Sequence, residues 1–215
     1  MTFEPLAVRT HEKMKEVLMN PEAAGPAVHY YMIRGGKDKR NITVWETGTV
    51  GGEYIKTYGH YHVGDLDETY EIVEGEGIAL LQKLVTENGV PQIDRVEEFK
   101  AIKVSASSKG GSSSGGKGGS AFGGKAVNSV YMPAGYGHLV VNTGKTWLVT
   151  SDDSPVDGIN DSASMPGHAD YEPVKKMRGF AYYVVEKDGI PVLVRNPLYK
   201  EIRKMDVGAL NIANS

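Results

Sequence analysis

Short runs of residues rich in β-branched and aromatic side chains follow one another from Val28 to about residue 200. Gly, Asn and Asp interrupt them at roughly ten-residue intervals, a spacing typical of all-β barrels and sandwiches. The predicted strands lie within residues 27–33, 41–50, 53–63, 68–75, 77–84, 97–104, 129–133, 138–142 and 146–152. Residues 180–197 read as a hairpin that turns at Asp188-Gly189.

Helical patterns are few and short. Residues 9–19 place Met14, Val17 and Leu18 at helical spacing behind Thr10, a suitable N-cap, so one short helix is expected there. A second short helix is expected within residues 170–177, inside an otherwise irregular stretch at about 155–178. The tail after Leu198 is weakly patterned and predicts either another short helix or a frayed end.

The segment at about 105–124 consists mainly of Gly and Ser. Such a composition buries little apolar surface and predicts a flexible surface loop between two strands, or alternatively a lid over a site. It is not expected to divide the chain, because strands of one barrel lie on both sides. We therefore predict a single domain over residues 1–215.

The composition of the chain excludes several classes of partner and of reactive site. The 215 residues carry a formal net charge of −3, which gives no reason to expect nucleic acid or a membrane surface as a partner. The absence of cysteine excludes disulfides, thiolate metal sites and a cysteine nucleophile. The first residues lack the apolar core of a signal peptide, so a soluble, cytoplasmic protein is expected.

The informative constellation is made of His60, His62, Glu68 and His138. Alternate residues of a strand point to one face, so His60 and His62 project together while Tyr61 points away. A tight turn through residues 63–67 would return the next strand antiparallel, and Glu68 at its start would face both histidines. His138 opens another strand after a Pro/Gly turn, and closure of the barrel would bring it to the same place.

Three imidazoles and one carboxylate suit a divalent transition metal, such as Fe, Mn, Ni or Zn, with room left for water or substrate. Asp65 and Asp67 are alternative carboxylates. Glu68 is preferred because the six residues that separate it from Gly75 fit the pattern described next.

These residues resemble the two cupin motifs, HxH(x)3–4E(x)6G and PxGxxHxxxN, except that five residues separate His62 from Glu68. The second motif is carried by residues 133–142. The resemblance implies a cupin jelly-roll β-barrel, a double-stranded β-helix with one or two short peripheral helices. Residues 57–62 with 68–70 are more specifically similar to the archaeal-type, cupin phosphoglucose isomerases, and the likeness extends loosely over residues 28–200.

That resemblance implies interconversion of glucose 6-phosphate and fructose 6-phosphate, in glycolysis and gluconeogenesis, by a homodimer. Glu68 would be the base through a cis-enediol, with a metal-assisted hydride shift as the competing route. The implied catalytic residues are Glu68, His138 and Tyr70. The implied substrate or phosphate contacts are Thr43, Thr57, Gly59, Tyr70, His168 and Tyr171. Apart from the resemblance, Lys56 and Arg34 are two unranked candidates to offset the charge of the phosphate. Ser154 stands where the family has a tyrosine, which leaves substrate details open.

Other functions share the same motifs. A metal-dependent cupin dioxygenase uses similar ligands, and an apolar pocket lining would favour it. A non-catalytic, sugar-binding cupin is a third reading, which a missing ligand would favour. A mannose phosphate isomerase would differ from the first function only in its substrate.

Overall fold

The computed structural model describes residues 6–35, 40–106, 126–155 and 168–213. Strands dominate these ranges, so the all-β prediction is confirmed, and the helices are short as expected. No helix within the described ranges is long and apolar enough to cross a membrane. Most of the Gly/Ser-rich segment and residues 156–167 lie outside the described residues, so neither the loop nor the lid prediction is tested.

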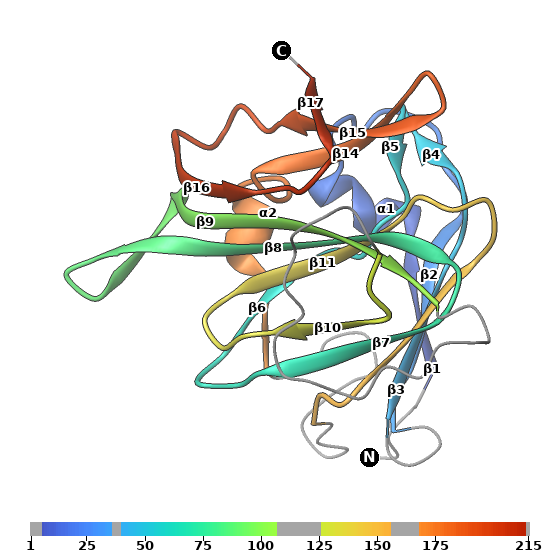
Figure 1. Ribbon diagram of the computed structural model, residues 1–215, viewed down its shortest axis with the longest axis horizontal. Helices are drawn as coiled ribbons and strands as arrows, with labels where there is room; N and C mark the ends of the chain where they lie inside the picture. The colour runs from blue at the N-terminus through green and yellow to red at the C-terminus, as the bar shows by residue number, and fades with distance from the viewer. Residues whose placement is uncertain (1–5, 36–39, 107–125, 156–167, 214–215) are drawn as a thin grey trace.

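The strands form three sheets (Figure 1). The first sheet contains, in spatial order, β1 (Leu6–Thr10), β2 (Val28–Ile33), β3 (Asn41–Trp45), β12 (Leu148–Asp152), β7 (Glu68–Glu74) and β10 (Ser129–Met132). The second contains β13 (Ala169–Asp170), β6 (His60–His62), β11 (Gly137–Asn142), β8 (Glu76–Glu87), β9 (Val90–Ser105) and β16 (Glu201–Asp206). The third contains β17 (Asn211–Ala213), β15 (Ile190–Arg195), β14 (Tyr182–Lys187), β5 (Glu53–Tyr54) and β4 (Thr49–Val50).

Eight strands of the first two sheets pair in a nested order, in which the first strand pairs with the last, the second with the second-last, and so on. In chain order they are β3 and β6 to β12, and β3 pairs with β12, β6 with β11, β7 with β10, and β8 with β9, all antiparallel. This nested pairing, split over two sheets, is the jelly roll of cupins. The predicted fold is therefore confirmed.

One local expectation was wrong. The strand that begins at Glu68 does not return beside β6; it belongs to the first sheet, between β12 and β10. In a jelly roll the chain crosses the barrel between these two strands, so the turn at residues 63–67 is a crossover and not a hairpin. Glu68 faces the histidines from the opposite sheet.

The outer face of the second sheet is covered as well as its inner face, and every residue of β11 is buried. Gln82 of β8 ties this outer face to the C-terminal segment: its amide nitrogen donates to the hydroxyls of Tyr61 (2.6 Å) and Tyr199 (2.9 Å), and its carbonyl accepts from the backbone N–H of Ala181 (2.9 Å). Tyr61 thus points away from its two neighbouring histidines, as predicted.

The C-terminal tail differs from the prediction. It contains two strands, β16 and β17, which pair parallel with β9 and β15. The sequence pattern is weak because both are edge strands, in which every residue is exposed or half-buried. The hairpin of β14 and β15 is confirmed, with Asp188 (φ 54°) and Gly189 (φ 76°) at its turn. The second short helix is α2 (Glu172–Lys176).

The first helix is shorter than residues 9–19. Helix α1 (His11–Met14) has Thr10 as its N-cap, as predicted, and a 3-10 turn, η1 (Lys15–Val17), follows it. Pro21 has no N–H, so it could not donate to the carbonyl of Val17 if the helix continued. That carbonyl instead accepts a hydrogen bond from the buried Lys56 ammonium at 2.6 Å.

Candidate metal centre

Four side chains meet between the two main sheets. His60, His62 and His138 come from the neighbouring strands β6 and β11 of the second sheet, where His138 lies directly opposite His60. Glu68 comes from the first strand position of β7 in the first sheet. One ligand atom from each of the four lies within 4.8 Å of all the others, so the cluster has the dimensions of a metal site.

The ligand atoms are buried and available. His62 Nε2 lies 2.8 Å and His138 Nε2 3.8 Å from Glu68 Oε2. Nε2 of His60 and of His138 make no hydrogen bond within the described part of the chain, and His62 Nε2 and Glu68 Oε2 have only each other. The other ring nitrogen of His62 lies 2.9 Å from the carbonyl oxygen of Leu66, which fixes the ring. Buried polar atoms without partners are costly, and a metal ion bound among them would satisfy them.

The geometry favours Glu68 over Asp65 and Asp67 as the carboxylate of the candidate metal site. Asp65 and Asp67 are exposed on the crossover, and Asp67 accepts a hydrogen bond from Tyr131 at 2.5 Å. Glu68 is only 3% exposed and takes part in the cluster. One extra residue in the crossover, relative to the motif spacing, therefore leaves the metal-facing position of the glutamate intact.

Other motif residues build the scaffold. Gly75 has φ +82°, and a Cβ there would lie 2.4 Å from the carbonyl oxygen of Trp147, so only glycine fits. Asn142 is fully buried; its amide nitrogen donates to the carbonyls of Glu46 (3.0 Å) and Thr146 (2.9 Å), and its side-chain oxygen accepts from the N–H of Gly144. These residues shape the turns that carry the strands with the ligands.

The pKa values favour the metal-binding forms of three ligands. Burial, with the like charge of neighbouring histidines, lowers the pKa of His60 far below its usual range, and burial lowers that of His138 to about 4. Burial opposes ionisation of Glu68, but the charges and contacts of His138 and His62 prevail and lower its pKa to about 2. Burial also lowers the pKa of His62, yet Glu68 outweighs it and the net shift is upward.

The remaining predicted residues lie around this cluster. The ring of His168 is 5.7 Å from that of His62, and the ring of Tyr171 is 5.4 Å from that of His60, because β13 between them pairs with β6. The ring of Tyr70 lies 5.5 Å from that of His138. Burial, with the carboxylates of Glu68 and Asp152 close by, raises the pKa of Tyr70 well above 10, which keeps its phenol protonated.

Three other residues predicted to contact the sugar phosphate are Thr57, Gly59 and Thr43. Thr57 and Gly59 support the fold, and Thr43 lies in the sheet opposite the three histidines. Thr57 accepts the N–H of Val140 at 3.0 Å. Gly59 has φ +81° and packs against Leu139. Thr43 is buried on β3 in the first sheet. Sequence reasoning alone could not separate these roles, because threonine and glycine are common in strands and turns.

Lys56 is ill-placed for the phosphate role suggested for it. Its ammonium is 3% exposed, lies 2.6 Å from Glu53 Oε1, donates to the carbonyl of Val17 and sits 5.1 Å from the ring centre of Tyr183. It therefore joins β5 to the N-terminal turn. Sequence reasoning missed a different group, Asp152, whose pKa burial and the charge of Glu68 raise to about 6.

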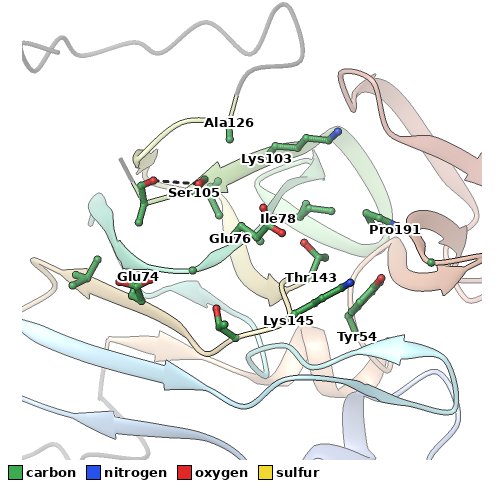
Figure 2. Close-up of a pocket in the computed structure, with 17 residues that line it drawn as sticks. Tyr54, Glu74, Glu76, Ile78, Lys103, Ser105, Ala126, Thr143, Lys145 and Pro191 are labelled. Atoms are coloured by element: carbon green, nitrogen blue, oxygen red, sulfur yellow. Dashed lines mark hydrogen bonds between the residues drawn. The ribbon is translucent and has the colours of Figure 1, made fainter. Parts of the chain in front are cut away.

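A large cavity lies elsewhere. A hollow of about 830 Å³ is lined by residues such as Tyr54, Glu76, Lys103 and Lys145, which Figure 2 labels. None of the predicted site residues lines it, and it adjoins Gly75, at the end of β7 remote from Glu68. The chemistry-bearing side chains therefore define the candidate site better than the size of the hollow does.

A comparison with protein families matches the family described as glucose-6-phosphate isomerase (GPI) over residues 28–109 and 121–199. The chain belongs to this glucose-6-phosphate isomerase family. Among curated relatives, the glucose-6-phosphate isomerases of Thermococcus kodakarensis and Thermococcus onnurineus are each 30% identical, over 160 and 159 residues. The matches cover 74% of this chain and 63% and 62% of those relatives, so the chain spans less than two thirds of their length.

Solved structures show weaker likenesses to this member of the isomerase family. A capsular polysaccharide assembling protein, CapF of Staphylococcus aureus, is 16% identical with a TM-score of 0.36, covering 62% of this chain and 28% of that one. Oxalate oxidase in complex with a substrate analogue is 15% identical with a TM-score of 0.31, covering 53% and 39%.

Proposed function

We propose that the protein interconverts glucose 6-phosphate and fructose 6-phosphate, using one divalent metal ion held by His60, His62, Glu68 and His138. The observation that carries the proposal is the buried cluster of four candidate ligand atoms, none of which is hydrogen-bonded to a described residue outside the cluster, in a chain of the isomerase family. The donor set of three nitrogens and one oxygen suits Fe, Mn, Ni or Zn. When bound, such an ion polarises the C1 and C2 oxygens of the sugar.

The protein's own residues supply the rest. Glu68 is ionised because its pKa is about 2, so it is in the form that accepts a proton from C1 or C2 and returns it through a cis-enediol. Tyr70 keeps its proton and is placed to donate a hydrogen bond beside Glu68. His138 completes the catalytic set. Thr43, Thr57, Gly59, His168 and Tyr171 remain our candidates for contacts with the sugar phosphate.

Further parts of the proposal concern the whole protein. We expect residues 1–215 to act as one cupin domain, in the cytoplasm, within glycolysis or gluconeogenesis. We also expect a homodimer, because barrel edges such as β1 carry exposed apolar side chains, including Leu6 and Val8, which a second copy would cover. Gel filtration with light scattering tests the dimer.

The first experiment assays purified protein with fructose 6-phosphate, coupling glucose 6-phosphate to a dehydrogenase. Activity should disappear with EDTA and return with one of the four metals. Glu68→Gln should abolish turnover, whereas Asp67→Asn, a matched change on the exposed crossover, should not. No turnover by folded, metal-loaded protein would refute the isomerase, and a dioxygenase or a sugar-binding protein would then be tested. Deuterium from D2O at C2 of the product would support proton transfer, and its absence the hydride shift.

A further inference from the structure

A row of polar side chains crosses the inner face of the first sheet next to Glu68. Asp152, at the end of β12, lies opposite Tyr70 of β7 on one side and Asn41 of β3 on the other. Arg34 follows β2 two residues after the buried Met32, so it continues the inward-facing positions of that strand. The row therefore leads from the strand of Glu68 to Arg34.

Hydrogen bonds fix this row. The amide nitrogen of Asn41 donates to Asp152 Oδ1 at 2.7 Å, and the side-chain oxygen of Asn41 accepts the N–H of Gly35 at 3.1 Å. Asp152 Oδ1 also accepts the N–H of Ser154 at 3.2 Å. Asn41 thus holds the backbone next to Arg34 on one side and the carboxylate of Asp152 on the other.

The second oxygen of Asp152 orients Arg34. Asp152 is 1% exposed, and its Oδ2 has no hydrogen bond among the described residues but lies 3.9 Å from an Nη atom of Arg34. That distance exceeds the 2.7–2.9 Å of a close charged hydrogen bond. The guanidinium, with a side chain 14% exposed, is therefore held near the carboxylate without a tight pair between these two atoms.

Arg34 lies on the side of the site that Glu68 occupies. Its guanidinium is 3.9 Å from Asp152, which lies opposite Tyr70, two residues after Glu68 on β7. Lys56, the other cation considered, is committed to Glu53 on another side of the barrel.

Beneath this row the sheet offers hydroxyl groups. Thr150 is fully buried, its Oγ1 has no hydrogen bond among the described residues, and it lies opposite Thr43 on β3. A buried hydroxyl without a partner points to a ligand that supplies one. Phosphate sites combine the planar fork of a guanidinium with hydroxyl donors, and Arg34, Thr150 and Thr43 supply both kinds of group on this sheet.

We propose that Arg34 binds the phosphate group of the substrate, and that Asp152 and Asn41 are positioning residues that hold Arg34 for this task. The inference rests on the proposed isomerase function and deepens it, because it assigns the anionic end of the sugar phosphate to the first sheet. The C1–C2 end then lies toward the metal ligands.

The test compares Arg34→Met with Arg40→Met in metal-loaded protein. Arg40→Met is a matched control because it removes the same charge from the residue next to Asn41. The Arg40 side chain donates a hydrogen bond to Ser151 and lies 3.7 Å from Glu71, so it is engaged away from Asp152. Arg34→Met should raise KM for fructose 6-phosphate by roughly 10- to 100-fold, the loss expected for a charged hydrogen bond, with kcat nearly unchanged. Inhibition by inorganic phosphate should weaken by a similar factor. Arg40→Met should leave both constants unchanged.

Two further variants separate binding from folding. Arg34→Lys keeps the charge without the planar fork and should give an intermediate KM. Asp152→Asn can still accept the hydrogen bond from Asn41, so a rise in KM with kcat and metal content preserved would mark Asp152 as a positioning residue. If Arg34→Met and Arg34→Lys leave KM and phosphate inhibition unchanged, the assignment is wrong.

Failure of this assignment and failure of the isomerase function give different results. Calorimetric binding of inorganic phosphate to the wild-type protein and to Arg34→Met does not depend on turnover. Wild-type protein that binds phosphate through Arg34 but does not isomerise fructose 6-phosphate would refute only the proposed reaction. Active wild-type protein whose phosphate binding is insensitive to Arg34→Met would refute only the anchor.

Discussion

The buried His29, paired with the half-buried His11, makes the stability of the apoprotein depend on pH in a predictable direction. His29 is fully buried on β2, and its Nε2 lies 2.9 Å from Nδ1 of His11, which in turn lies through Nε2 3.1 Å from the carbonyl oxygen of Ala23. Burial, with the charges of His11 and Lys56, lowers the pKa of His29 from 6.5 to about 4. Folding therefore favours the neutral ring.

The sign follows from proton binding. Between pH 6.5 and 4 the unfolded chain holds a proton on His29 that the folded protein does not, so the free energy of unfolding falls as the pH falls through this window. Lowering the pKa from 6.5 to about 4 corresponds to about 3 kcal/mol at the acid end, since a tenfold change in proton affinity is about 1.4 kcal/mol. Above pH 7 the effect vanishes, because His29 is neutral in both states.

The assay is urea unfolding followed by tryptophan fluorescence, from pH 4 to pH 7.5 with EDTA present, for wild type and His29→Gln. The glutamine cannot titrate, so the stability difference between the two proteins isolates His29 from other groups, including Asp152, whose raised pKa acts in the opposite direction. The advantage of wild type should shrink by about 3 kcal/mol from pH 7.5 to pH 4. Parallel pH profiles for the two proteins would refute the reasoning.

Three other changes have defined outcomes. Lys56→Met should lower the free energy of unfolding measured in urea by roughly 3–5 kcal/mol, because it leaves the carboxylate of Glu53 buried without its cation. Adding Glu53→Gln to that variant should recover part of the lost stability. Metal at 100 times its Kd should stabilise the protein by about 2.7 kcal/mol and raise Tm by roughly 5–10 °C, and Glu68→Gln should abolish most of this shift in a thermal melt. Gly77→Ala should destabilise by roughly 1–3 kcal/mol, since its Cβ would lie 2.2 Å from the carbonyl oxygen of Val141; an unchanged Tm would contradict this.

The pair His60 and His62 and the turns near the candidate metal site were predictable from sequence because they follow local rules. His60 and His62 share a face by strand alternation, and the glycine and asparagine positions that follow at fixed spacing impose turns that few other residues allow. Alternation and turn chemistry act over a few residues, so they are visible in the sequence. The hairpin at Asp188-Gly189 was predictable for the same reason.

The errors arose where distant contacts decide the outcome. The carbonyl of Val17, at the end of the first helical segment, accepts a hydrogen bond from Lys56, 39 residues further along the chain, and no local pattern indicates that contact. The tail forms strands because β9 and β15 present free edges to it, and no residue of the tail encodes that partnership. Asp152 escaped notice because its neighbours Asn41 and Arg34 are more than 100 residues away in sequence, and no motif spans that separation.

The arrangement of the two sheets also constrains how this site can change its specificity. The three histidines belong to the second sheet, whose outer face is sealed by the Gln82 network, so a substitution there disturbs packing on both faces. The first sheet contributes a single ligand, Glu68, while Arg34, Asn41 and Asp152 fill neighbouring strands of it. Substitutions along this row can alter recognition of the anionic end of a substrate while three of the four metal ligands keep their supports. Differences in substrate among proteins with these ligands are therefore expected first on β2, β3 and β12.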